Sequence, residues 1–359
     1  MPAYPTNCIP KGDVTLYRAG AYVRSWTGKT AAQRGTALLS SSAASLANDT
    51  LVIGPGTFDI ASTAITILGG QTFILCGSTI THTDATVNIF NATTVDNWAI
   101  TGRGTLTGVA NTVANECGIK ATNCENYVIE NLLIQQFGSY GIDLRALSDT
   151  TMTTYRKRSK ISNVTAFNCQ NGFNLGPRCE YNHFDNATAI NNVVTGFLVQ
   201  GGNNFFTNCI AAENYNGIKI TNGDNGGHGT WTGGALNHNT NINVWGQAAL
   251  GFTFAGAAIY GNGSTSGYIY YETTLAKLNF IGCDISAPLA AAGTPAGMNM
   301  FASCYLGSGY TSASGTMTAA VRALINWSDC YTSTGPSTEN TTIAPGVFAN
   351  VPLMAQVFG

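Results

Sequence analysis

The side chains with the most useful chemistry recur at one position of a short motif: glycine, an apolar residue, a variable residue and a second apolar residue. Lys120, Asp143 and Asn174 take the variable position in three copies, and Lys219 takes it in a later copy. Because alternate side chains of a strand point to the same face, we expect one outward column on a sheet. The predicted column is Lys120, Asp143, Asn174, Leu198, Lys219 and Thr253.

The chemistry of this column suits a ligand with acidic groups and hydroxyls. An ammonium group binds carboxylates, an amide donates and accepts hydrogen bonds, and a carboxylate acts as a general acid or base. Asp143 has two interpretations: that catalytic role, or an exposed ion pair with Lys120 on the neighbouring strand, which would contribute about 0–1 kcal/mol. Lys219 is three strands further on, about 14 Å away at the usual strand spacing, so it and Asp143 cannot act on the same bond.

Two stretches interrupt the motif series and are expected to leave the fold as loops beside the column. One runs from Ala146 to Lys160 and the other from about Asn222 to Leu236. Loops on a rigid scaffold often carry function. Aromatic rings stack on sugars and cations bind uronate or sulfate groups, so the loops either wall a groove for an acidic polysaccharide or are simply solvated. The side chains expected in the groove are Tyr155 and Arg156 from the first loop, and His228 and Trp231 from the second.

A polysaccharide lyase is one reaction class that fits these candidates. It needs a cation to neutralise the uronate carboxylate and a base for the C5 proton. Arg145, two residues beyond Asp143, would supply the cation, and His228 the base. The predicted catalytic residues are therefore Asp143, Arg145, Lys219 and His228, and the predicted substrate-binding residues are Lys120, Asn174, Tyr155, Arg156 and Trp231.

A glycoside hydrolase is the other class, and it needs two carboxyl groups roughly 5–5.5 Å or 6.5–9.5 Å apart. Asp143 is the single acid of its column, so its partner would come from a loop, as Asp149 or Asp224. Glu130 and Asp185 form an alternative acid pair in another column, two strands or about 10 Å apart. The spacing therefore leaves lyase and hydrolase both open.

The elements that position these residues follow from an internal repeat. Asn131, Asn163, Asn186 and Asn208 recur in a shared apolar pattern, at intervals of 32, 23 and 22 residues. The period of the repeat is therefore near 22 residues. This is too short for helical-pair repeats, whose periods are about 33 residues or more. Short period-two segments between Gly and Asn turns predict strands stacked coil upon coil, with asparagine in the left-handed turns and its amides forming a ladder. The sequence therefore predicts an all-β parallel β-helix, a solenoid.

The ends of the chain depart from the repeat. The sequence predicts an N-terminal arm over residues 1–29 and a short capping helix over residues 30–47. The β-helix is expected over residues 48–310, and residues 311–359 are expected to form an irregular C-terminal cap or assembly tail. Caps are needed because an uncovered coil exposes the edges of its strands.

Composition excludes several classes of protein. Charged residues make up 9% of the chain, against about 25% in an average domain, while the apolar share is normal, so the chain is not disordered. A net charge of −2 gives no basic field for nucleic acid. The longest nearly apolar stretch, Ala248 to Tyr260, is shorter than the roughly 20 residues that span a bilayer. The N-terminal residues lack the apolar core of a signal peptide.

The ten cysteines include no CxxC pair and have no histidine at metal-ligand spacing, so no zinc site is predicted. Several of them recur at similar places in the repeat. We expect small buried residues stacked in the solenoid, with disulfides as the alternative.

The repeat resembles the pectin-lyase-like superfamily of right-handed parallel β-helices. The resemblance rests on DTLVIGPGTFDI at 49–60, on ITGRGTLTG at 100–108 and on the repeats from 118 to 254, and it extends over roughly residues 10–310. It implies a right-handed β-helix but no single activity, because the fold carries lyases, hydrolases, epimerases and tailspikes. Of the polygalacturonase signature, Gly227-His228-Gly229 is present, whereas the paired carboxylates and the R-I-K element are missing. The aspartate cluster of a calcium site is not visible either, so no cofactor is predicted.

Three hypotheses about function follow from the resemblance. The first is a polysaccharide-degrading enzyme, lyase or hydrolase, of the phage tailspike type, which would be a homotrimer associated with the virion. The second is a non-catalytic glycan-binding or virion structural protein of the same shape. The third is a secreted bacterial lyase or epimerase. All three imply a polysaccharide partner and an extracellular or virion-associated location.

Overall fold

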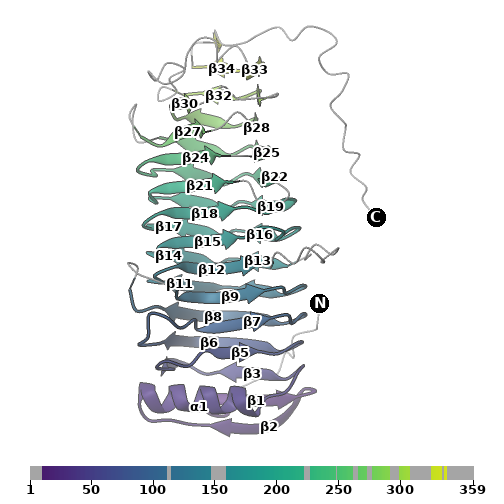
Figure 1. The fold of residues 1–359 in the computed structure, drawn as a ribbon, viewed down its shortest axis with the longest axis vertical. Helices are drawn as coiled ribbons and strands as arrows, with labels where there is room; N and C mark the ends of the chain where they lie inside the picture. The colour runs from purple at the N-terminus through teal and green to yellow at the C-terminus, as the bar shows by residue number, and fades with distance from the viewer. Residues whose placement is uncertain are drawn as a thin grey trace.

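The chain forms an elongated right-handed parallel β-helix, seen in a computed structural model (Figure 1). The structure describes residues 10–110, 115–146, 159–221, 227–247, 249–261, 266–272, 277–291, 299–307, 325–333 and 335–337. Two sheets run along its length, and each regular coil gives two short strands to sheet A and one to sheet B. The predicted fold class is therefore confirmed.

Within the described residues, sheet B has ten strands, and neighbouring strands come from successive coils (Figure 1). They are β5 (Ile65–Ile67), β7 (Phe90–Thr93), β9 (Cys117–Thr122), β12 (Tyr140–Arg145), β15 (Asn171–Leu175), β18 (Thr195–Val199), β21 (Asn216–Ile220), β24 (Ile242–Gly246), β27 (Tyr268–Tyr271) and β30 (Leu289–Ala291).

Sheet A contains the remaining strands and forms the other walls of the solenoid. They are β1 (Val14–Arg18), β2 (Ala21–Trp26), β3 (Thr50–Ile53), β4 (Gly56–Asp59), β6 (Thr72–Thr81), β8 (Ala99–Thr107), β10 (Val128–Glu130), β11 (Leu132–Gln135), β13 (Lys160–Ser162), β14 (Thr165–Phe167), β16 (His183–Asp185), β17 (Thr188–Ile190), β19 (Asn204–Thr207), β20 (Ile210–Ala212), β22 (Gly227–Thr232), β23 (Ala235–Asn237), β25 (Ala249–Ala255), β26 (Ala258–Tyr260), β28 (Lys277–Ile281), β29 (Asp284–Ser286), β31 (Asn299–Ala302), β32 (Tyr305–Leu306), β33 (Ile325–Ser328), β34 (Tyr331–Thr332) and β35 (Gly335–Pro336).

The asparagines of the repeat make the turns between the two sheet A strands of a coil, as predicted. Asn131, Asn163, Asn186 and Asn208 all have positive φ, between 51° and 59°. Asn163 Nδ2 donates to Asn131 Oδ1 at 3.1 Å, and Asn186 Nδ2 donates to Asn163 Oδ1 at 3.3 Å. This outer amide ladder holds successive coils in register. A second, buried ladder was not predicted: Asn192 donates to Asn214 at 2.8 Å, and Asn214 donates to Asn239 at 3.0 Å.

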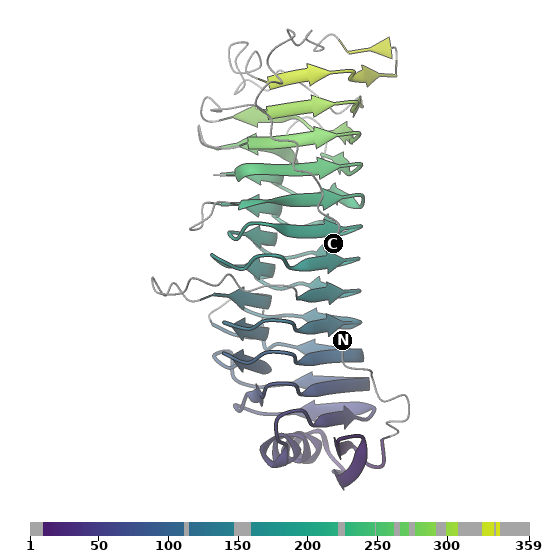
Figure 2. The same ribbon diagram turned by 90° about the vertical axis from the view of Figure 1, so that its right-hand side faces the viewer.

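The N-terminal end is closed by a helix and a hairpin (Figure 2). Helix α1 (Ala31–Ala44) begins with a capping box in which Thr30 and Gln33 bind each other's backbone N–H groups. The helix lies within the predicted range 30–47. The described part of the expected arm is not a free arm, because β1 pairs antiparallel with both β2 and β3.

Coil stacking also continues past residue 310. Strand β33 pairs in parallel with β31, so residues 325–328 extend sheet A. Eight of the nine described cysteines are buried and all nine are free thiols, in agreement with the expected stacking of small residues in the core. Within the described chain, no helix has the length and apolar character that crossing a bilayer requires.

The motif series needs one correction at its C-terminal end. The motif at Gly251–Phe254 belongs to β25 in sheet A, where Thr253 pairs with Thr230. Sheet B instead continues through β24, in which Asn243 stands where earlier coils have glycine. Trp245 therefore follows Lys219 in the column, in place of the predicted Thr253.

Candidate functional site on the outer face of sheet B

One column of side chains runs across successive strands of sheet B. Lys120, Asp143 and Asn174 are register partners on β9, β12 and β15, so the structure brings these three predicted residues together. Lys219 is in the same column, three strands beyond Asp143. The whole column reads Thr66, Asn91, Lys120, Asp143, Asn174, Leu198, Lys219, Trp245, Tyr270 and Ala290.

Asp143 is the fixed centre of the N-terminal half of this column. Its side chain is fully buried, and Arg145 Nε lies 2.9 Å from Oδ1 and 2.7 Å from Oδ2. Asn174 Nδ2 donates to Oδ1 at 2.7 Å. The hydrogen bond to Asp143 raises the pKa of Arg145. Asp143 is therefore occupied in orienting Arg145, and the ion pair expected with Lys120 is made with Arg145 instead.

A hollow of about 520 Å³ lies beside this pair, over β5, β7, β9 and β12. Asn88 Nδ2 donates to Asn91 Oδ1 at 2.7 Å, so part of the wall is a fixed amide pair. Two cations among amides and hydroxyls suit a ligand that combines a carboxylate with several hydroxyl groups. The lining residues are Thr66, Asn88, Asn91, Thr93, Lys120, Thr122 and Arg145.

Tyr140 joins this cluster and was not predicted from the sequence. The Arg145 guanidinium carbon lies 6.0 Å from the centre of the Tyr140 ring. Burial, and then the charge of Asp143, raises the pKa of the Tyr140 phenol. Strict alternation along the strand would place Tyr140 on the inner side with Ile142, so the period-two pattern gave no signal for it.

Lys219 belongs to a different cluster on the same face. Its Nζ lies 3.8 Å from the centre of the Trp245 ring, and Trp245 Nε1 donates to Glu272 Oε2 at 2.6 Å. Desolvation lowers the pKa of Lys219, against the opposing charge of Glu272. The sequence motif did not point to Trp245, because Asn243 replaces the glycine that marked the other copies.

The second expected loop is mostly not a loop. Residues 227–232 and 235–237 form β22 and β23, so they are part of the solenoid wall. Trp231 is fully buried in the core, with its ring centre 5.4 Å from that of Phe206. The prediction that Trp231 stacks on a sugar is therefore wrong. His228 lies in sheet A, where its ring packs against Gly202, whereas Arg145 ends a strand of sheet B.

The remaining predicted residues are either elsewhere or outside the described chain. Glu130 and Asp185 lie in sheet A and pair in register through Ser162, two strands apart. Glu130 Oε1 accepts from Lys160 Nζ and Ser162 Oγ, both at 3.0 Å, so that acid is committed to neighbours. Tyr155, Arg156, Asp149 and Asp224 lie outside the described residues.

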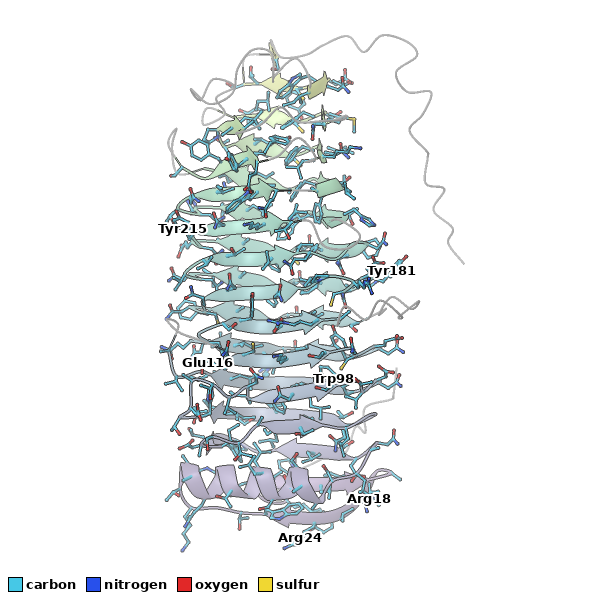
Figure 3. All side chains as sticks on the ribbon, in the orientation of Figure 1. Arg18, Arg24, Trp98, Glu116, Tyr181 and Tyr215 are labelled. Atoms are coloured by element: carbon cyan, nitrogen blue, oxygen red, sulfur yellow. The ribbon has the colours of Figure 1, made fainter. Side chains whose placement is uncertain are left out.

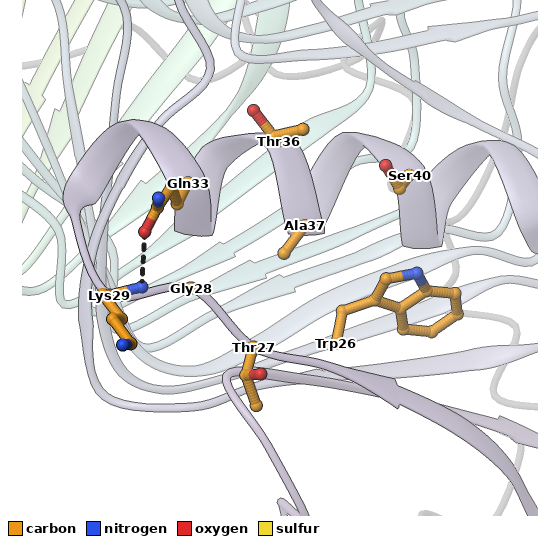
Figure 4. Close-up of a pocket in the computed structure, with 8 residues that line it drawn as sticks. All are labelled: Trp26, Thr27, Gly28, Lys29, Gln33, Thr36, Ala37 and Ser40. Carbon is orange, nitrogen blue, oxygen red and sulfur yellow. Dashed lines mark hydrogen bonds between the residues drawn. The ribbon is translucent and has the colours of Figure 1, made fainter.

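Two other features of the described residues bear on the site. No group of three or more His, Cys, Asp or Glu side chains is arranged to hold a metal ion in this part of the chain. A larger hollow, of about 680 Å³, lies at the N-terminal cap between helix α1 and the end of β2 (Figure 4). Its wall includes Trp26 and Lys29 but no carboxylate, so we place no acid–base chemistry there.

The chain has a right-handed parallel β-helix fold, which is the fold that the resemblance to the pectin-lyase-like superfamily implied. Among solved structures, it is similar to the A-modules of the mannuronan C-5 epimerases AlgE4 and AlgE6 from Azotobacter vinelandii, both at 15% identity, with TM-scores of 0.52 and 0.54. Each likeness covers 84% of this chain, and 87% and 85% of the respective modules. A rhamnogalacturonan lyase is similar at 14% identity and a TM-score of 0.51, over 86% of this chain and 84% of the lyase. No protein-family model and no curated protein sequence matches the chain.

Proposed function

We propose that this chain acts on a uronate-containing polysaccharide bound along the outer face of sheet B, as a lyase or a C5 epimerase. The observation that carries the proposal is that Arg145, oriented by the buried Asp143, shares a hollow with Lys120. Two cations at one pocket neutralise a carboxylate, and amides and hydroxyls around them suit sugar hydroxyls. The epimerase and lyase names of the similar structures support the same class of substrate.

Neutralising the uronate carboxylate is the step that makes C5 chemistry accessible. The C5 hydrogen becomes acidic when negative charge that develops on the carboxylate is stabilised, and fixed cations provide that stabilisation. Arg145 and Lys120 would hold the carboxylate. Solvent water in the open hollow would accept the C5 proton. The Tyr140 phenol, whose raised pKa keeps it protonated at neutral pH, would then donate a proton on the Arg145 side of the pocket, to C5 in an epimerase or to the leaving glycosidic oxygen in a lyase.

Hydrolysis is less well supported by the described site. It needs two carboxyl groups with room for a sugar between them. Asp143 is buried against Arg145 and Asn174, so it is poorly placed to exchange protons with a sugar. The Glu130–Asp185 pair lies in sheet A, away from the hollow.

The location and assembly of the protein follow from the substrate as further proposals. Uronate polysaccharides are cell-wall and capsule polymers, so the protein would work outside the cell or on a virion. A tailspike-type protein would also assemble as a homotrimer. Sedimentation of the purified chain tests that assembly, and a monomer at assay concentrations would exclude it.

An activity screen on uronate polymers tests the proposed reaction. Mannuronan and polygalacturonan would be incubated with the chain in deuterated water, and unsaturated products, reducing ends and deuterium at C5 would be measured. A lyase yields unsaturated products with new reducing ends, whereas an epimerase yields deuterium at C5 without cleavage. Reducing ends without either other signal would mean a hydrolase, and silence on every polymer that still binds would mean a non-catalytic glycan-binding protein.

The chain offers a closely matched control for this screen. Arg145→Ala should lower activity about a hundredfold or more, as loss of a transition-state cation does. Arg18 is held by the buried Asp49 at 2.8 Å, with a side-chain exposure of 45% against 44% for Arg145. Arg18 lies at the N-terminal end of the molecule (Figure 3). Arg18→Ala should therefore leave activity unchanged, and equal losses in the two variants would contradict the proposed site.

A further inference from the structure

A second cluster lies on the same outer face, nearer the C-terminal end of sheet B. Lys219, Trp245 and Tyr270 are register partners on the adjacent strands β21, β24 and β27. Glu272 directly follows β27, and its backbone N–H donates to the Gly246 carbonyl at 2.9 Å. Neither the hollow near Arg145 nor the proposed chemistry uses any of these side chains.

The indole of Trp245 is fixed from several sides. Lys219 Nζ lies over its face, 3.8 Å from the ring centre, and its Nε1 donates to Glu272 Oε2 at 2.6 Å. Gln247 Nε2 donates to the other oxygen of Glu272 at 3.3 Å. The Tyr270 ring stands edge-on to the indole, with the ring centres 6.1 Å apart. These contacts hold an aromatic surface in one orientation before any ligand arrives, which reduces the entropy cost of binding.

The groups of this cluster match the surface of a sugar ring. Trp245, Tyr270, Gln247 and Glu272 are all partly exposed, so solvent reaches each of these four residues. Aromatic side chains provide apolar contact area, a carboxylate accepts hydrogen bonds from hydroxyls, and an ammonium group binds a hydroxyl or a carboxylate. The combination suits an acidic sugar ring better than a nonpolar ligand or a nucleic acid.

We propose that Lys219, Trp245, Tyr270 and Glu272 form a distal subsite that binds another sugar unit of the same polymer held near Arg145. This inference rests on the proposed function, because it needs a uronate polymer along sheet B. Strand β24 is four strands from β12, about 19 Å at the usual spacing. Asn174 and Leu198 occupy the column between Asp143 and Lys219, so no charged side chain of this column interrupts the path. A polymer reaches both sites, whereas a disaccharide reaches one.

Tryptophan fluorescence can report on this subsite separately. Trp98, Trp231 and Trp327 are buried, with exposures of 1%, 0% and 1%, which leaves Trp26 and Trp245 as the indoles that reach solvent. In a Trp26→Phe variant, mannuronan or polygalacturonan should change the emission of Trp245 and shield it from iodide quenching. The matching uronate disaccharide should change neither. In Trp245→Phe, the response to polymer should disappear, and a response that persists there would overturn the subsite.

Affinity measurements separate this proposal from the proposed function. Trp245→Ala should weaken polymer binding about tenfold, or about 1.4 kcal/mol, and change disaccharide binding by less than about twofold. Trp26→Ala is the matched control, because Trp26 also has a cation, Arg24, over its ring at 5.1 Å; it should change neither. Arg145→Ala should weaken the binding of both the polymer and the disaccharide.

The outcomes of these variants are distinct. Polymer binding that is unchanged in Trp245→Ala, or weakened equally for both ligands, overturns the distal subsite while the site near Arg145 stands. Normal binding by Arg145→Ala, with weakened polymer binding by Trp245→Ala, overturns the proposed site near Arg145 while the subsite stands. Failure of the unmodified chain to bind any polyuronate overturns both.

Discussion

Two arginines of this chain are held in nearly the same way by a buried aspartate, yet their surroundings differ. Arg18 binds Asp49 at the N-terminal cap, and Arg145 binds Asp143 on sheet B. The second pair has Lys120, amides and hydroxyls beside it, around a hollow. At the residue scale, an arginine–aspartate ion pair alone therefore does not indicate a binding site; the neighbouring groups and the hollow do. The motif pointed to Asp143 and Arg145, but it did not show that the buried Asp143 holds Arg145.

Replacing Asp143 tests whether it anchors Arg145 for binding. Asp143→Asn keeps the shape of the side chain but removes the charge that orients Arg145, so uronate binding should weaken about tenfold, as loss of a charge-assisted hydrogen bond does. Asp49→Asn is the control: it removes the matching charge beside Arg18 and should leave uronate binding unchanged. Titration calorimetry with a uronate oligosaccharide measures the effect. Unaltered binding by Asp143→Asn would show that Arg145 needs no anchor.

The buried thiols predict how stability depends on pH. Burial raises the pKa of Cys169, Cys179 and Cys209 to about 12, from an ordinary value of 9.0. Above pH 9.0 the unfolded chain loses these protons while the folded chain keeps them. The folded state then binds more protons, so the free energy of unfolding falls as the pH rises from 9.0 towards 12.

Urea unfolding at a series of alkaline pH values measures this slope. Cys209→Ala should make it shallower, because one of the contributing thiols is removed. A slope that is unchanged in Cys209→Ala would mean that this thiol does not contribute to the alkaline loss of stability.

At the scale of elements, the turns explain which coils could be read from the sequence. Coils with asparagine in the left-handed turn and glycine in the sheet B motif were assigned correctly, with Ile129, Ile161, Phe184 and Phe206 in register. The turn between β22 and β23 has Gly233 and Gly234 at φ of 66° and 67° instead. Glycine and asparagine both adopt the left-handed conformation with positive φ, so the asparagine pattern did not mark this coil. Trp231 was consequently placed in a loop although it belongs to a strand.

The capping helix provides a prediction at this scale. Glycine inside a helix is usually replaced by alanine with a gain of about 1 kcal/mol. At Gly35, however, an added Cβ would lie within 1.7 Å of the Asp59 carbonyl oxygen of β4. Gly35→Ala should therefore lower the melting temperature, because the helix must move off the first coil. Thr36→Ala, on the exposed side of α1, is the control and should be neutral or slightly stabilising; a stabilised Gly35→Ala would mean that the helix is not packed this closely.

At the scale of the whole molecule, the solenoid separates its two outer surfaces. Sheet B presents the charged and aromatic column from β9 to β27. Sheet A presents other aromatic side chains, including Tyr260, Tyr305 and Tyr331. The stacking of coils was predictable from the period, because each coil repeats the same turns. The column of Lys120, Asp143 and Asn174 on one face was also predicted, but its extension through Trp245 and Tyr270 required the register between β21, β24 and β27.

Hydroxyl-radical footprinting with a bound uronate polymer tests whether the polymer lies along sheet B, because it compares the two faces in one sample. Aromatic side chains on both sheets are oxidised when they are exposed, and a bound polymer shields those it covers. We expect protection of Tyr140, Trp245 and Tyr270 on sheet B, with unchanged oxidation of Tyr305 and Tyr331 on sheet A. Protection of the sheet A tyrosines without protection on sheet B would contradict it.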